Sequence, residues 1–196
     1  MRIAVSGTHF SGKSALVEAL SGALPSYDTV EEPYHLMEEE GYEFPGVPSF
    51  EDFELQLQRS LESLSGSGPD VIFDRCPIDL LGYLLTHHDA DAFRLEEWMP
   101  RVRPAIEKLD LIVYLPVERP DRITVPSSQD KSFRLEVDEK LKELLMGNST
   151  DLNIDVLEVT GALDSRVEQV LTYLRERGAD VTGRYRPAGQ RGRTGR

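Results

Sequence analysis

Cysteine is almost absent from the 196-residue sequence, which contains only Cys76. A single cysteine excludes an internal disulfide framework and a cysteine-rich zinc site, and it fits a reducing compartment. Long hydrophobic runs are missing too. No stretch approaches the roughly 18 apolar residues of a membrane-spanning helix, and the three apolar residues 3–5 before Gly7 are too few for the apolar region of a secretory leader. We therefore expect a cytoplasmic protein with no membrane partner.

Basic residues are scarce over most of the chain. The sequence has 22 Lys and Arg against 35 Asp and Glu, which gives a formal charge of −13. Residues 178–196 hold five of the basic residues and one of the acidic ones, so residues 1–177 carry −17. A surface of that sign repels nucleic acid, and we expect no such partner. The basic segment 178–196 has too few apolar residues to order itself and is predicted to be a flexible tail.

Short apolar runs alternate along residues 1–177 with stretches of helical periodicity. Because short, continuously apolar strands fit burial on both faces of a sheet, the pattern predicts an α/β fold. Its sheet is expected to be doubly wound, mainly parallel, of about five strands, and flanked by helices. The expected strands are 3–5, 29–31, 71–73, 111–115 and 156–159, and the expected helices are 14–24, 50–64, 77–85, 132–146 and 165–174.

Local signals add three expectations to this outline. Residues 33–48 lack periodicity and are expected to be irregular. Ser165 and Glu168 have capping-box spacing, which predicts that the last helix begins there. Lys131 and Arg134 stand at the start of the preceding helix, where cations oppose the helix dipole. Their placement indicates a contact with phosphate or with an acidic group.

A phosphate-binding loop is the most specific motif. It matches G-x-x-x-x-G-K-[ST] between an apolar strand and a helix, at Gly7, Thr8, His9, Phe10, Ser11, Gly12, Lys13 and Ser14. The two glycines let successive backbone amides approach phosphate oxygens, Lys13 reaches the terminal phosphates, and the Ser14 hydroxyl binds Mg²⁺. The motif predicts binding of a nucleotide with Mg²⁺ and a fold of the P-loop NTPase type; it leaves the choice between ATP and GTP open, and His9 has no assigned role.

An acidic residue ends the third expected strand, beside the P-loop. Asp74 is therefore predicted as the second magnesium contact. ATPases of the AAA and ABC kinds normally place a water-activating glutamate next, whereas this chain has Arg75, a group suited to holding a phosphate or an acceptor. Hydrolysis as the main activity is disfavoured.

Together these motifs resemble the P-loop small-molecule kinases. That group includes nucleoside and nucleoside-monophosphate kinases, the kinase half of bifunctional ribosylnicotinamide kinases, and small AAA-like domains. The resemblance covers residues 1–177 as one domain. It rests on the loop at 7–14, on Glu31-Glu32-Pro33, on Asp74 to Asp79, and on an arginine-bearing loop after the fourth strand.

The resemblance implies roles for individual residues. In deoxynucleoside kinases the glutamate before such a proline takes the proton of the acceptor hydroxyl, which makes Glu32 the candidate base and leaves Glu31 open. Arg75 is implied to hold acceptor or phosphate, although an ion pair with Glu32 is the structural alternative. Residues 117–131 correspond to a kinase lid whose Arg119 and Arg122 close over the phosphates.

The same resemblance places the purine of ATP at the loop after the last strand, near Ala162. Aromatic residues follow the candidate base and could line an acceptor pocket or tie their loop to the core: Tyr34, Tyr42, Phe44, Phe50 and Phe53. Gln56 and Gln58 both remain candidates for reading a base edge.

The sequence thus predicts a phosphotransferase that moves the γ-phosphate of Mg·ATP to a small, nucleoside-like or nucleotide-like acceptor. The alternative is an AAA-like regulatory module in which ATP occupancy orders the lid and residues 33–48 for a protein partner. Only the kinase needs a positioned base. The oligomeric state stays open.

Overall fold

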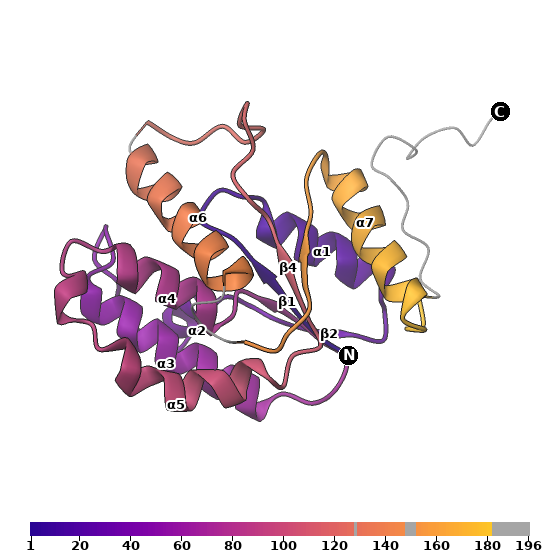
Figure 1. Cartoon of the computed structure of the whole chain (residues 1–196), viewed down its shortest axis with the longest axis horizontal. Helices are drawn as coiled ribbons and strands as arrows, with labels where there is room; N and C mark the ends of the chain where they lie inside the picture. The colour runs from indigo at the N-terminus through magenta and orange to yellow at the C-terminus, as the bar shows by residue number, and fades with distance from the viewer. Residues whose placement is uncertain (128, 148–151, 182–196) are drawn as a thin grey trace.

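The computed structural model describes residues 1–127, 129–147 and 152–181 (Figure 1). Within these residues, five strands form one parallel sheet in the order β2-β3-β1-β4-β5. The predicted doubly wound, parallel α/β fold is confirmed. The strands are β1 (Arg2–Ser6), β2 (Asp28–Val30), β3 (Val71–Asp74), β4 (Leu111–Tyr114) and β5 (Val156–Glu158).

Helices cover both faces of this sheet (Figure 1). On one face lie α1 (Lys13–Ala23) and α7 (Leu163–Glu176). On the other lie α3 (Phe50–Gly66), α4 (Pro77–Thr86), α5 (Leu95–Ile106) and α6 (Lys131–Met146), and α2 (Pro33–Glu39) packs on α3. A short 3₁₀ turn (Ala90–Ala92) joins α4 to α5.

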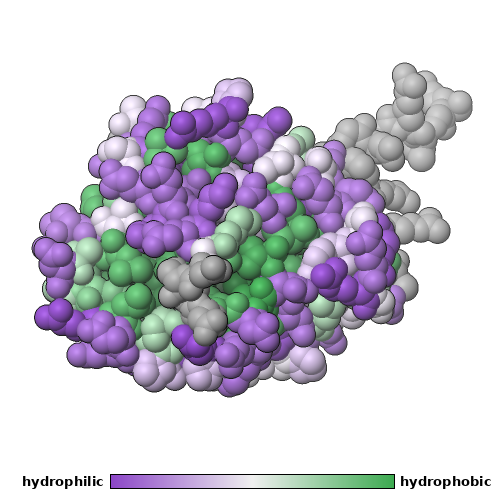
Figure 2. Space-filling view, in the orientation of Figure 1, coloured by the Kyte–Doolittle hydropathy of each residue, from purple (hydrophilic) through white to green (hydrophobic). Residues whose placement is uncertain are grey.

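Successive strand residues face opposite cores, as the two-residue period of a strand requires. Ile3 and Val5 are fully buried against α1 and α7, whereas Ala4 between them is buried against the other helices. This double burial explains the continuous apolar runs in the central strands β1, β3 and β4. In Figure 2 hydrophilic residues cover most of the surface over α6 and α7, with hydrophobic residues in separate patches. No described helix is long and apolar enough to cross a membrane.

Two helices, α2 and α5, lie outside the ranges in which the sequence predicted helices. Residues 33–48 were predicted to be irregular, but α2 occupies Pro33–Glu39 because Pro33 is the first helical residue, where its fixed φ and missing amide hydrogen favour a helix start. The second helix, α5, contains Pro100 and Pro104 and still buries an apolar face that includes Val102 and Ile106. Tertiary burial there outweighs the loss of helical hydrogen bonds.

The predicted capping box of α7 is wrong. The helix begins at Leu163, after Gly161 in a left-handed conformation with φ 98°. Ser165 therefore lies inside the first turn, and its hydroxyl accepts a hydrogen bond from Gln169 Nε2 at 3.1 Å. The glycine allows the chain to turn earlier than the Ser-Glu spacing indicated.

Strand register brings the motif-bearing ends together. Val5 of β1 pairs with Asp74 of β3, and Ser6 pairs with Tyr114 of β4. The loops that follow β1, β3 and β4 therefore lie together at the carboxyl ends of the strands, where ligands of open α/β folds bind. The predicted tail, 178–196, lies outside the described residues from 182 onward.

Candidate active site

The P-loop needs its two glycines for both conformation and space. Gly7 has φ 152° and Gly12 has φ 90°. A Cβ atom on Gly7 would lie 2.7 Å from the carbonyl oxygen of Leu115, and one on Gly12 would lie 3.1 Å from Nη1 of Arg166. Any side chain at either position would collide with its surroundings or strain the backbone.

Lys13 is buried at the start of α1, and its Nζ donates to the carbonyl oxygen of Thr8 at 2.8 Å. Burial, and next to it the charge of Arg75, lowers the pKa of Lys13 to about 8. This ammonium is held inside the loop where the sequence predicted contact with terminal phosphates.

Three arginines, one directly after β3 and the others in α6 and α7, bind carbonyl oxygens of the P-loop. Arg75 donates to Gly7 O (3.1 Å), Arg134 to His9 O and Phe10 O (2.9 and 3.0 Å), and Arg166 to Ser11 O (2.7 Å). In a planar trans peptide the N–H points away from the C=O. These bonds therefore turn the N–H groups of Thr8, Phe10, Ser11 and Gly12 away from the arginines.

Arg134 is one of the two residues for which the sequence indicated a contact with phosphate or with an acidic group. It is buried and binds Asp121 as well as the P-loop carbonyls. Arg166 was not predicted. The helical periodicity of α7 could have indicated its burial, because Arg166 lies on the same buried face as Val167 and Val170. An arginine in that phase needs buried hydrogen-bond partners.

Two P-loop amides already donate to protein groups. Gly7 N donates to Oδ1 of the fully buried Asp79 at 2.8 Å, and His9 N donates to the Tyr83 hydroxyl at 2.8 Å. Asp79 also accepts from Cys76 N, so it ties the start of α4 to the P-loop. Burial, with the charges of Arg75 and other cations, lowers the pKa of His9 to about 4, which keeps its ring neutral. Sequence reasoning gave neither Asp79 nor Tyr83 a role.

Asp74 ends β3 with a buried Oδ1 that has no hydrogen-bond partner within the described residues. Ser14 is exposed in the first turn of α1. A buried, unpaired carboxylate oxygen and a hydroxyl are oxygen ligands of the kind that Mg²⁺ prefers. The residues present therefore fit the predicted magnesium site.

Glu32 and Arg75 form a close ion pair, with Glu32 Oε2 accepting from Arg75 Nε at 2.6 Å. His35 Nε2 lies 3.4 Å from the other carboxylate oxygen. Burial opposes ionisation of Glu32, but the charges of Arg75 and Lys13 outweigh it and lower its pKa to about 2. Glu31 is exposed at the end of β2. The predicted alternative for Arg75, an ion pair with Glu32, is thus present.

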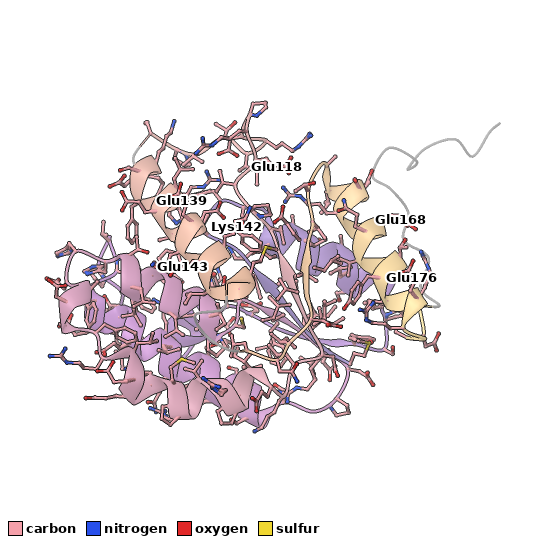
Figure 3. The ribbon with its side chains drawn as sticks, viewed as in Figure 1. Glu118, Glu139, Lys142, Glu143, Glu168 and Glu176 are labelled. Carbon is pink, nitrogen blue, oxygen red and sulfur yellow. The ribbon has the colours of Figure 1, made fainter. Side chains whose placement is uncertain are left out.

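Glu118, the second residue of the predicted lid, lies between α6 and the start of α7 in Figure 3. Arg122 is more than half exposed and donates to Glu118 Oε2 at 2.7 Å, and Arg119 is exposed. Glu118 Oε1 accepts from Gly161 N at 2.9 Å, in the loop predicted to hold the purine. Ala162 is exposed as the N-cap of α7. Roles for Arg119, Arg122 and Ala162 stay predictions.

The expected aromatic cluster is divided into two groups. Tyr34 stacks on Phe44 with ring centroids 4.2 Å apart, and Tyr42 meets Phe44 edge to face. Phe50 and Phe53 are instead buried in the core. The first group borders α2, whereas the second supports α3 and α4.

The structure distinguishes the two glutamines of α3. Gln58 is exposed and bonded to Glu62 and Arg101. Gln56 is 4% exposed, and its Nε2 has no hydrogen-bond partner among the described residues. A buried amide without a partner costs free energy unless something else satisfies it.

Comparison with known proteins identifies the family to which this chain belongs. A family model described as an AAA domain matches residues 2–166. No curated protein matches the chain.

Solved structures of kinases have the same fold. Deoxyadenosine kinase from M. mycoides has a TM-score of 0.65 and 18% identity, over 90% of this chain and 100% of its own. Thymidylate kinase from Candida albicans has a TM-score of 0.60 and 16% identity, over 90% and 92%. Shikimate kinase from Aquifex aeolicus has a TM-score of 0.51 and 17% identity, over 91% and 98%. The chain therefore belongs to the AAA domain family and has the fold of the P-loop small-molecule kinases.

Proposed function

We propose that this protein is a kinase that transfers the γ-phosphate of Mg·ATP to a hydroxyl group of a small molecule. The observation that carries the proposal is the carboxylate of Glu32, which is held ionised by Arg75 and Lys13 at the edge of the sheet where the P-loop opens. A binding module needs no carboxylate at that place. A kinase needs one to orient the acceptor hydroxyl and take its proton.

The residues of the site supply the parts of such a reaction. The P-loop amides and Lys13 bind the phosphates, and Arg122 stabilises the charge that spreads over the transferred group. Glu32 takes the proton as the acceptor oxygen bonds to the γ-phosphorus and the bond to the bridging oxygen of ADP breaks. Ser14 and Asp74 would hold Mg²⁺, which when bound neutralises charge on the phosphate oxygens.

The solved structures that share the fold support a small-molecule acceptor. They are kinases named for a deoxynucleoside, a nucleotide and shikimate. One was solved with dATP bound, which supports ATP as the phosphate donor here.

Charge favours an acceptor that carries no phosphate. Residues 28–93, which contain Glu32, Arg75 and the aromatic group around Tyr34, hold 16 Asp and Glu but two Arg and no Lys. Both arginines are paired, Arg59 with Glu40 and Arg75 with Glu32. A phosphorylated acceptor needs cations of its own, whereas a neutral or cationic nucleoside does not.

The acceptor is proposed to contain a planar ring. Tyr34, two residues after the candidate base, stacks on Phe44, and Tyr42 meets Phe44 edge to face, so an aromatic group begins close to Glu32 in the chain. Gln56 lies on the buried face of α3, one turn from Asp52, and the hydroxyl of Tyr42 donates to Asp52 at 2.6 Å. We therefore propose that the unpaired amide nitrogen of Gln56 donates a hydrogen bond to an acceptor atom of the substrate's ring, from the side of α3 that carries Asp52.

The test is ADP release from Mg·ATP, alone and with nucleosides, nucleoside monophosphates or ribosylnicotinamide. We expect an unphosphorylated acceptor to stimulate turnover in the wild type and no turnover in Lys13→Ala. Glu32→Gln should lose about 10²–10⁴-fold in kcat. The matched control is the exposed neighbour, Glu31→Gln, which should behave as wild type.

The regulatory alternative gives a different result. If ATP binds through Lys13 but no acceptor stimulates turnover and Glu32→Gln changes nothing, the kinase proposal is wrong. Loss of activity in Glu31→Gln with an active Glu32→Gln would instead move the base to Glu31.

A further inference from the structure

A buried arginine of α7 joins the P-loop to the lid. Arg166 Nη1 donates to Ser11 O at 2.7 Å, and its Nη2 donates to Glu118 Oε1 at 2.8 Å. The side chains of Arg166 and Glu118 are 7% and 16% exposed. The same guanidinium therefore holds a backbone carbonyl of the P-loop and the first carboxylate of the lid.

A second buried arginine makes an equivalent bridge from the other face of the sheet. Arg134 of α6 donates to His9 O and Phe10 O, and its Nη1 donates to Asp121 Oδ2 at 2.7 Å. Its side chain is 4% exposed. Two helices that pack on opposite faces thus connect neighbouring lid carboxylates to consecutive P-loop peptides.

Direct packing accompanies these bridges at Gly12. A Cβ atom on Gly12 would lie 3.1 Å from Arg166 Nη1 and 3.2 Å from Ile123 Cδ1. The P-loop, the lid and α7 therefore meet without spare room. A displacement of the lid would change the surroundings of the P-loop directly.

We propose that Glu118 and Asp121 are positioning residues that fasten the lid to the P-loop through Arg166 and Arg134, so that lid placement and amide orientation are coupled. The coupling acts through peptide geometry. Each carbonyl held by an arginine turns the N–H of the same peptide, that of Phe10, Ser11 or Gly12, to the opposite side. Preorganised donors of this kind bind phosphate without a further ordering cost. The inference rests on the proposed function for the identity of the ligand.

Glu118 binds Arg122 and Arg166 through different carboxylate oxygens, so Arg122 can leave without breaking the contact to Arg166. Its Oε1 accepts from Arg166 and Gly161, whereas its Oε2 accepts from Arg122. Burial works against ionisation of Glu118, but the hydrogen bonds from these groups lower its pKa to about 2. Arg122 can therefore transfer to a phosphate while the bridge to Ser11 remains.

The first experiment measures amide hydrogen exchange of residues 10–12 in the nucleotide-free protein. Glu118→Gln keeps the shape of the side chain but loses its charge, and should speed this exchange on the order of tenfold. The matched control is Glu168→Gln, which removes a second glutamate–arginine pair on α7, one that is exposed and far from the loop in sequence. It should leave residues 10–12 unchanged.

The second experiment measures the Kd of Mg·ADP. Glu118→Gln and Arg166→Gln should each weaken binding about tenfold, and the double variant should be no weaker than Arg166→Gln, because both remove one bridge. If Arg166→Gln does not fold, Arg166→Lys replaces it, since lysine keeps the charge but cannot hold two partners in a fork.

Unchanged exchange at residues 10–12 in Glu118→Gln, or additive losses in the double variant, would overturn the coupling. A variant that loses thermal stability but neither exchanges faster nor binds ADP more weakly would also overturn it. Exchange needs neither nucleotide nor acceptor. Failure of the kinase proposal would therefore leave this result standing, and an active kinase with unchanged exchange would refute only the coupling.

Discussion

Glu32 Oε2 and Arg75 Nε lie 2.6 Å apart, although 43 positions separate these residues in the sequence. Parallel pairing of β2 with β3 brings the two strand ends together. Arg75 also donates to Gly7 O, so the candidate base is connected to the phosphate loop through one guanidinium. The pair is compatible with catalysis, because an arginine that keeps the glutamate ionised also fixes its orientation.

Replacement of Arg75 by lysine should therefore be costly. Arg75→Lys keeps the charge but cannot bind both Glu32 and Gly7 O, and we expect a loss of about 1–3 kcal/mol in the free energy of unfolding. Urea denaturation measures this loss. Arg59→Lys, at an exposed pair with Glu40, should change stability by less than about 1 kcal/mol. Equal effects in both variants would contradict a special role for Arg75.

The depressed pKa of Glu32 predicts a defined pH dependence. Because its folded-state pKa is about 2, below the unfolded value of about 4.3, ionised Glu32 stabilises the protein above that unfolded value. This contribution is lost as the pH falls toward 2. The difference in unfolding free energy between wild type and Glu32→Gln should be constant above about pH 5 and shrink below it. A difference that stays constant down to pH 3 would argue against the ion pair.

Lys13 should take up a proton when nucleotide binds at alkaline pH. Its pKa of about 8 in the free protein means that part of the population is neutral at pH 9, and phosphates that contact the amine favour the charged form. Calorimetry in buffers of different ionisation enthalpy measures this uptake. Lys13→Arg, which stays charged, should show none. Equal uptake in both proteins would assign the proton to another group.

Gly12 and Gly22 provide a test of the P-loop geometry, because they lie at opposite ends of α1. Gly12 has φ 90° and close neighbours, so Gly12→Ala should lower stability and abolish nucleotide binding. Gly22 is helical and has no atom within 4 Å of an added Cβ, so Gly22→Ala should stabilise the protein by about 0.5–1 kcal/mol. Thermal unfolding and ADP titration measure both. Nucleotide binding by Gly12→Ala would show that the loop tolerates the strain.

Features with a local cause could be predicted from the sequence. The P-loop follows from the spacing of Gly7, Gly12 and Lys13 between a strand and a helix, and the parallel sheet follows from continuously apolar strands. The predicted helix boundaries were wrong where a proline or a glycine is compatible with more than one local structure. Pro33 begins a helix instead of ending regular structure, and the turn at Gly161 lets α7 begin at Leu163, two residues earlier than expected.

By itself the sequence determined the P-loop, the parallel sheet and the acid that ends β3, because each depends on neighbours in the chain. Only the tertiary structure decided which P-loop carbonyls Arg75, Arg134 and Arg166 bind, and the use of Asp79 to hold Gly7 N. The residues joined by these P-loop contacts are between 68 and 155 positions apart. A charged side chain in a chain rich in charges has many possible partners, and burial selects among them only when the sheet and both helical layers are in place.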